Sequence, residues 1–177
     1  KNMFDYKREL LASYKPVSGS RTVIGLPMGL NMFELLPFWH TSFTKLGFGI
    51  ALSEDSSREL YVSGQHTIPS DTVCYPAKLL HGHIESLISQ GVQHIFYPCM
   101  TYNLDENLGD NNYNCPVVAY YPEVIRSNVK DLQNINFMCD YVGLHRPKDF
   151  VKKIHAILSE KFDGISLKEV KAATDSA

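Results

Sequence analysis

The sequence predicts a single three-layer α/β domain, in which helices flank a mostly parallel, Rossmann-like sheet. Short apolar segments rich in β-branched residues recur along the chain, and segments with helical periodicity separate them. This alternation is typical of right-handed βαβ units, which bind ligands outside the carboxyl ends of the strands. The 177 residues suffice to form a core without disulfides or metal.

The first half of the chain is expected to form two strands and three helices after a lead-in segment. Residues 1–20 are that segment, with a short amphipathic helix over 4–11 and a linker at Lys15–Ser20. The apolar runs 22–26 and 48–52 predict strands. Helix starts are indicated at Pro37 and Pro76 by a proline in the first turn and at Ser56 by capping-box spacing to Glu59; the expected ends are Gly47, Gly91 and Gly64.

The second half is expected to alternate three strands with two helices. The strands are predicted over 94–97, 117–120 and 137–142, and the helices begin at Pro122 and Pro147. A polar loop over 101–114 separates the first two strands. The α/β domain is therefore predicted to cover residues 21–165, and residues 166–177 a truncated C-terminal helix or tail.

Composition narrows the classes of function. The net charge of −2 argues against nucleic acid as the main partner, and no apolar run is long enough to span a membrane. The N-terminus has no apolar stretch of signal-peptide type, so we expect a cytoplasmic location without a membrane partner. No phosphate-binding loop motif is present, so no nucleotide site is expected. Because the chain does not begin with Met, we expect it to be a piece of a longer protein.

Three of the four cysteines share a local pattern. Cys74, Cys99 and Cys115 each lie within two residues of a proline, at the end of a predicted element, whereas Cys139 lies inside a predicted strand. A helix N-terminus favours the thiolate form that binds metal, and a thiol inside a strand is usually buried and inert. If the three sites converge, they supply three thiolates, whereas an iron–sulfur cube usually takes four, so that one iron would remain open. Buried, inert thiols remain the alternative at this point.

These residues lie in stretches that resemble one known domain. The stretches that carry the resemblance are 24–27, 37–40, 53–60, 68–79, 81–83, 96–99 and 113–118, preceded by a similar lead-in over 4–11. The sequence resembles the domain of unknown function in large activases related to the 2-hydroxyglutaryl-CoA dehydratase activator, the CoA-substrate-specific enzyme activase family. The resemblance implies a dehydratase-subunit-like α/β fold and a [4Fe–4S] cluster on Cys74, Cys99 and Cys115. It also implies ATP-binding modules in the same parent chain and an acyl-CoA dehydratase-type enzyme as the partner.

The resemblance thus predicts an iron–sulfur redox module linked to ATP-driven electron transfer, with no catalysis by this part of the chain alone. Two alternatives remain open: a docking domain with structural cysteines, and a zinc site in which His81 or His83 joins the three thiolates. As H-x-H on a helix, these histidines point to different sides, so at most one faces the site. Lys78 could balance the charge of a cluster. The tyrosines beside the cysteines could shield it from water, and these are Tyr75, Tyr97 and Tyr113.

Overall fold

The computed structural model describes residues 2–177 and contains one four-stranded sheet in which every strand pair is parallel. The strands are β1 (Val23–Leu26), β2 (Gly49–Leu52), β3 (His94–Phe96) and β4 (Asn136–Met138), and their order across the sheet is β2-β1-β3-β4. Because all strands run the same way, their carboxyl ends share one edge, which we call the carboxyl edge. The strand order reverses between β1 and β3, the place where such sheets open a crevice for ligands.

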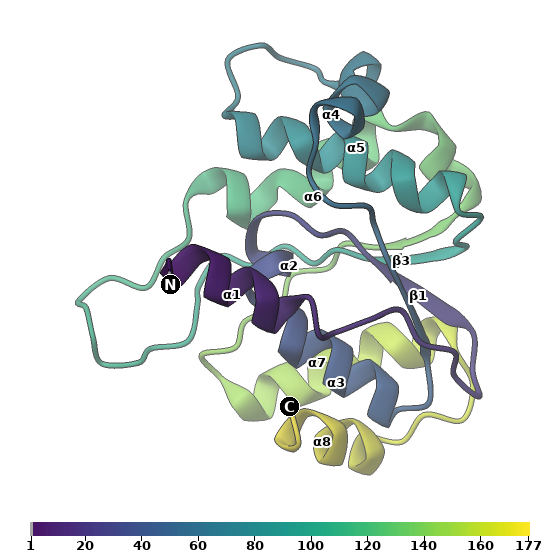
Figure 1. Ribbon diagram of the computed structural model, residues 1–177. Helices are drawn as coiled ribbons and strands as arrows, with labels where there is room; N and C mark the ends of the chain where they lie inside the picture. The colour runs from purple at the N-terminus through teal and green to yellow at the C-terminus, as the bar shows by residue number, and fades with distance from the viewer. Residues whose placement is uncertain (1) are drawn as a thin grey trace.

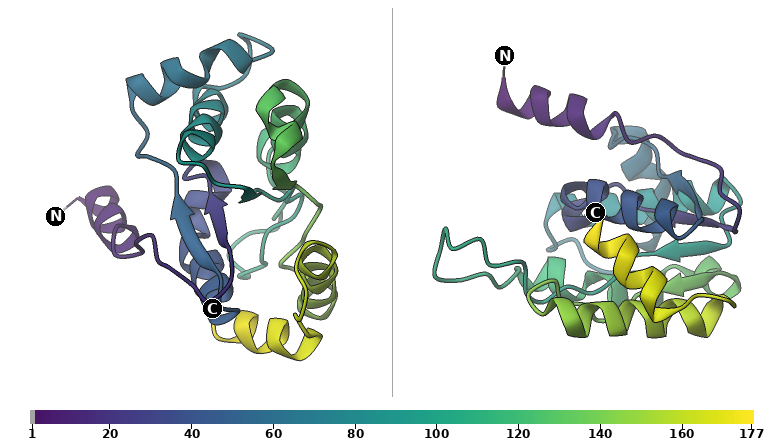
Figure 2. Two further views of the ribbon diagram at one scale, coloured as in Figure 1. Left: turned by 90° about the vertical axis from the view of Figure 1, so that its right-hand side faces the viewer. Right: turned by 90° about the horizontal axis from the view of Figure 1, so that it is seen from below.

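Helices cover both faces of this sheet, as the three-layer prediction requires (Figures 1 and 2). One layer consists of α4 (Arg58–Gly64), α5 (Tyr75–Ser89) and α6 (Pro116–Asn128); the other consists of α3 (Leu36–Lys45), α7 (Pro147–Lys161) and α8 (Leu167–Asp175). The short helix α2 (Leu30–Glu34) follows β1, and α1 (Met3–Leu11) lies beside the layers. Two 3₁₀ turns, η1 (Gln65–Thr67) and η2 (Lys130–Asn134), complete the chain. No helix among residues 2–177 has both the length and the apolar character that a bilayer crossing needs.

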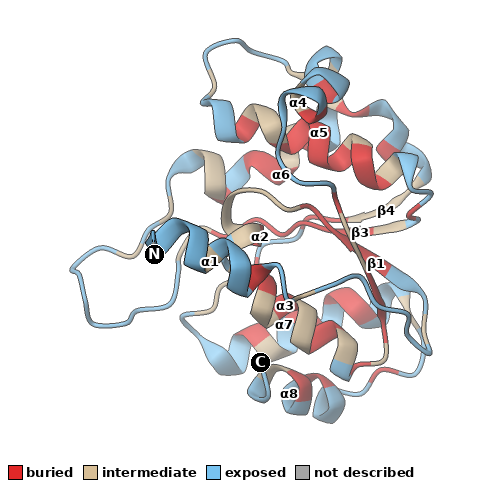
Figure 3. Ribbon diagram, in the orientation of Figure 1, coloured by how far each residue is buried: buried red, intermediate tan, exposed pale blue. Residues whose placement is uncertain are grey.

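The sheet is buried on both faces, which explains why its strands read as continuous apolar runs (Figure 3). Against the layer of α3 and α7, the only tryptophan, Trp39, packs on Phe96 with ring centroids 4.7 Å apart. Phe43 contacts the same Phe96 ring edge-on at 5.0 Å. An aromatic cluster therefore fixes β3 against α3, and β3 leads directly to Cys99.

The glycine signals for helix ends are confirmed at two positions. Gly47 after α3 and Gly91 after α5 both adopt positive φ, +85° and +76°, which glycine reaches without strain. A third glycine, Gly82, lies in the middle of α5 because α4 crosses there: a Cβ at this position would overlap the Leu60 carbonyl. Close approach of the two helix backbones therefore requires glycine.

The predicted strand over 117–120 is wrong, because these residues form the first turns of α6. Cys115 is the N-cap, with its Sγ accepting from the Val118 N–H at 3.5 Å, and Pro116 occupies the first helical position. The two valines after Pro116 have a high strand propensity, but the N-cap and the proline at the first helical position favour a helix. Pro122 lies inside α6 instead of starting it.

The structure refines three smaller expectations. The N-cap of α4 is Ser57, whose hydroxyl accepts from the Leu60 N–H at 3.0 Å, and not Ser56. The residues expected as a truncated helix or tail form α8, which begins with a capping box between Ser166 and Glu169 and packs on α3 and α7. The last strand is shorter than predicted, since β4 ends at Met138 and only an isolated bridge between Cys99 and Tyr141 extends its pairing.

Candidate functional site

Topology brings the three proline-flanked cysteines to the carboxyl edge of the sheet. Cys99 follows β3, whereas Cys74 and Cys115 are the N-caps of α5 and α6. Since these helices run antiparallel to the strands, their N-termini lie at the same edge as the carboxyl end of β3, on the left-hand side of Figure 1. Cys115 thus precedes a helix and not the strand that its sequence context suggested.

The three thiols differ in their surroundings. Cys99 is completely buried, and Cys74 and Cys115 are exposed; all three are free. Burial raises the pKa of Cys99 to about 12, with a smaller contribution from the neighbouring Cys139, so Cys99 is a neutral thiol in the metal-free protein. The other two sulfurs lie at the positive ends of helix dipoles, where negative charge is favoured.

The donor set has the chemistry of an iron–sulfur site, but its side chains are not drawn together. Thiols are the donors that iron–sulfur clusters take, and two helix N-termini suit an anionic cluster. Nevertheless, no three His, Cys, Asp or Glu side chains among residues 2–177 lie close enough to one another to hold a metal ion. Within the described part of the chain, these side chains therefore do not form a site for a single metal ion.

Cys139 also lies at the carboxyl edge, since it follows β4, but unlike the other three cysteines it has no neighbouring proline. It follows β4 directly, is buried, and lies beside the Arg126 guanidinium. Burial raises the pKa of its thiol, and no helix begins at it. Its burial, which Cys99 shares, fits the prediction of a core cysteine.

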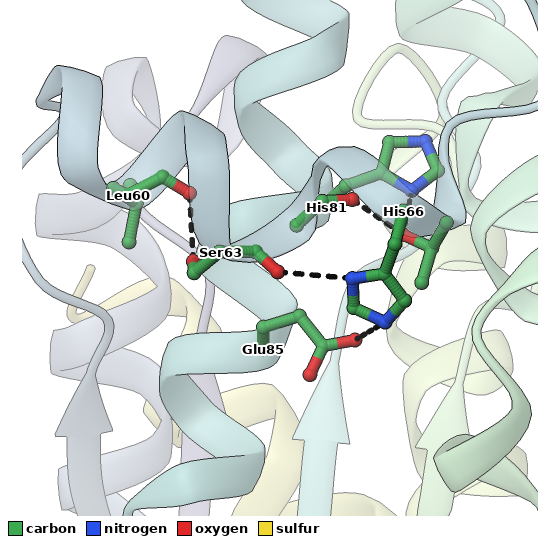
Figure 4. Close-up of polar contacts among 7 residues, drawn as sticks. Leu60, Ser63, His66, His81 and Glu85 are labelled. Atoms are coloured by element: carbon green, nitrogen blue, oxygen red, sulfur yellow. Dashed lines mark hydrogen bonds and ion pairs between the residues drawn. The ribbon is translucent and has the colours of Figure 1, made fainter.

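The two histidines of α5 are buried and point to different sides of the helix. His81 Nδ1 lies 2.7 Å from Thr67 Oγ1 and its Nε2 lies 3.0 Å from the Tyr121 hydroxyl. Burial, aided by the nearby His66, lowers the pKa of His81 to about 4. Figure 4 shows His81 above His66, which in turn lies between the Ser63 carbonyl and the Glu85 carboxylate. His81 is thus a neutral imidazole with both nitrogens occupied.

Both ring nitrogens of His83 also have hydrogen-bond partners. Its Nδ1 lies 2.8 Å from Ser53 Oγ and its Nε2 lies 3.0 Å from Ser56 Oγ. Ser53 Oγ also accepts from the Met28 N–H at 2.8 Å, so this histidine joins the loops that follow β1 and β2. Burial lowers the pKa of His83 to about 4, which makes it a weak base toward the Ser56 hydroxyl. The sequence indicated only the H-x-H pair and not these serine partners.

The other residues predicted to support a cluster are one lysine and the three tyrosines beside the cysteines. Lys78 Nζ donates to the Asp71 carbonyl in the loop before α5, at 2.8 Å. Tyr75 and Tyr113 are 54% and 72% exposed, so neither shields a cysteine in this structure. Tyr97 is fully buried, and its pKa is raised by burial and by the nearby thiols of Cys99 and Cys115.

A large cavity lies away from the cysteines. It measures about 640 Å³ and lies between α1 and the loops after β1 and β2, with Arg8, Lys15 and Asp55 among its lining residues. None of the three cysteines lines it. A neighbouring cavity of about 390 Å³ shares Arg8 and Asp55 and reaches His83. Neither cavity can be predicted from the sequence, because both depend on where α1 lies against the sheet.

Of three comparisons with known proteins, one found a match. No curated protein and no solved structure is detectably similar to this chain. One family model, described as the CoA enzyme activase uncharacterised domain, matches residues 23–177, from the start of β1 through α8. The chain therefore belongs to the family of CoA enzyme activase uncharacterised domains.

Proposed function

We propose that this domain is an iron–sulfur redox module in which Cys74, Cys99 and Cys115 hold a [4Fe–4S] cluster. The observation that carries the proposal is the shared position of these residues at the carboxyl edge, two of them at helix N-termini. When bound, such a cluster would supply one-electron transfer, with one iron not ligated by these thiolates. The chain itself would provide the thiolates, the helix dipoles and the buried wall behind Cys99.

Membership in the activase family supports a place for this module in electron transfer. In this role the domain passes an electron to an acyl-CoA dehydratase-type enzyme, and ATP-binding modules of the same parent protein supply the driving force. The completely buried Cys99 anchors the cluster to the core, and the exposed Cys74 and Cys115 are on the side that a partner can reach.

A zinc site is less well supported than an iron–sulfur site. It would need His81 or His83 as the fourth ligand, but all four imidazole nitrogens already lie within 3.0 Å of serine, threonine or tyrosine hydroxyls. Ligation through either residue would break a buried hydrogen bond, which costs about 1–3 kcal/mol.

A docking domain without metal is the second candidate function. It is favoured by one observation, namely that no metal-binding group is drawn together among residues 2–177. In this case the carboxyl edge would contact the partner directly and the cysteines would remain thiols.

Anaerobic reconstitution with ferrous iron and sulfide separates the two functions. The redox module predicts about four iron atoms per chain, with an EPR signal after reduction. The changes Cys74→Ser, Cys99→Ser and Cys115→Ser should each lower the iron content, whereas Cys139→Ala, at the core cysteine, should keep it. Full iron content in Cys99→Ser would refute this ligand set, and absence of iron from the wild-type chain would favour docking.

A further inference from the structure

A chain of hydrogen bonds lies behind the carboxyl edge, and the position of each proton in it can be derived. Thr67 Oγ1 donates to the Gly64 carbonyl at 2.8 Å, so its single proton is used there. It must then accept from His81 Nδ1, 2.7 Å away, which puts the imidazole proton on Nδ1. His81 Nε2 is left without a proton and accepts from the Tyr121 hydroxyl at 3.0 Å.

These proton positions determine which hydrogen bonds Tyr121 can still make. Its proton is committed to His81, so toward the cysteines its oxygen can only accept. Tyr121 lies close enough to Cys74 for the thiol to influence it electrostatically. The hydrogen-bonded chain thus ends beside a predicted ligand without providing a donor to it.

The Tyr97 hydroxyl, in contrast, is a hydrogen-bond donor that is still unused. It is buried and finds no hydrogen-bond partner among residues 2–177. The groups that act on it electrostatically are Cys99, Tyr121 and Cys115, so two of the three predicted ligands are in its vicinity. A buried hydroxyl without a partner is costly, and such groups in folded proteins call for an explanation.

We propose that the Tyr97 hydroxyl donates a hydrogen bond to a sulfur atom of the cluster that Cys74, Cys99 and Cys115 hold. A thiol sulfur is a weak acceptor, whereas a metal-bound thiolate or a bridging sulfide carries negative charge and accepts well. This difference explains why the donor is unpaired in the metal-free chain. Tyr97 is also two residues from Cys99 along an extended segment, so both side chains leave it on the same face.

This inference rests on the proposed function and assigns Tyr97 the role of a positioning residue that tunes the cluster. Hydrogen bonds to cluster sulfurs stabilise the more negative, reduced state and so raise the reduction potential. Loss of one such bond is expected to disfavour reduction by about tenfold, which for one electron corresponds to about 59 mV.

The test compares Tyr97→Phe with Tyr75→Phe in the reconstituted 177-residue chain. Both variants remove one hydroxyl beside a predicted ligand, but Tyr75 is exposed and its hydroxyl reaches water. We expect all three proteins to hold the same iron, and only Tyr97→Phe to show the lower potential in an EPR-monitored redox titration. Equal potentials in the loaded proteins would overturn the role of Tyr97 while leaving the proposed function intact.

The metal-free chain provides a second readout. Because the hydroxyl has no partner there, Tyr97→Phe should unfold at the same urea concentration as the wild type or at a higher one. A lower midpoint would mean that the hydroxyl already has a structural partner and would also overturn the inference. If the wild-type chain takes up no iron, the proposed function fails first and the role of Tyr97 fails with it.

Discussion

The buried, neutral His81 makes the stability of this domain sensitive to mild acid. Its pKa is about 4 in the folded chain, against 6.5 for an ordinary histidine. Below pH 6.5 the unfolded chain therefore takes up a proton at this position that the folded chain does not, so stability falls as the pH falls. The loss continues until about pH 4, where the folded protein is protonated as well.

The size of this loss of stability follows from the two pKa values of His81. Each pKa unit corresponds to 1.36 kcal/mol, and between pH 7 and pH 5 the linkage relation gives a loss of about 2 kcal/mol from His81. Such a loss is a large part of the roughly 5–15 kcal/mol that stabilises an ordinary domain. His83, which has the same low pKa, should contribute a similar loss.

Urea unfolding followed by Trp39 fluorescence at pH 7 and pH 5 measures this effect. The variant His81→Gln cannot take up the proton, so the pH-dependent loss should be about 2 kcal/mol smaller than in the wild type. Any fixed cost of the substitution cancels, because only the difference between the two pH values is compared. The exposed His145→Gln serves as the matched control and should keep the wild-type loss. If His81→Gln kept it too, the idea of a buried neutral imidazole would be untenable.

Two further predictions concern the contacts that support α5. In Gly82→Ala, the new methyl group overlaps the Leu60 carbonyl, so the variant should lose several kcal/mol (about 3 or more) in urea unfolding, whereas Gly109→Ala, in open space, should change little. In Ser53→Ala, a backbone N–H and an imidazole lose their buried partner, which should cost about 1–3 kcal/mol; the same change at the exposed Ser56 should cost clearly less. Equal losses at the two serines would contradict the hydrogen-bond assignment around His83.

The sequence was a good guide where local chemistry and burial agree. Strands buried on both faces show continuous apolar runs, and glycines at positive φ mark the ends of α3 and α5, so these elements could be read directly. It was a poor guide at residues 117–120, where β-branched side chains indicated a strand. There the strand propensity of the valines is outweighed at the start of the helix. The Cys115 side chain accepts a hydrogen bond from a backbone N–H of the first turn, and Pro116 has no N–H that needs a partner.

The candidate site shows the same division. Local pattern predicts a set of three cysteines that leaves out Cys139, because prolines and helix starts are properties of short segments. The partners of the buried polar groups could not be read in this way. Thr67 and Tyr121 are 14 and 40 residues from His81, and only the packing of α6 and η1 on α5 brings them together.

By itself, then, the sequence determined the α/β class, the family and the set of three proline-flanked cysteines. All three depend on residue order along the chain, which the sequence records completely. Only the tertiary structure decided which edge the cysteines share, that Cys99 is buried while the other two are exposed, and that Tyr97 has an unused donor. These properties depend on distances between segments far apart in the chain, and packing alone sets such distances.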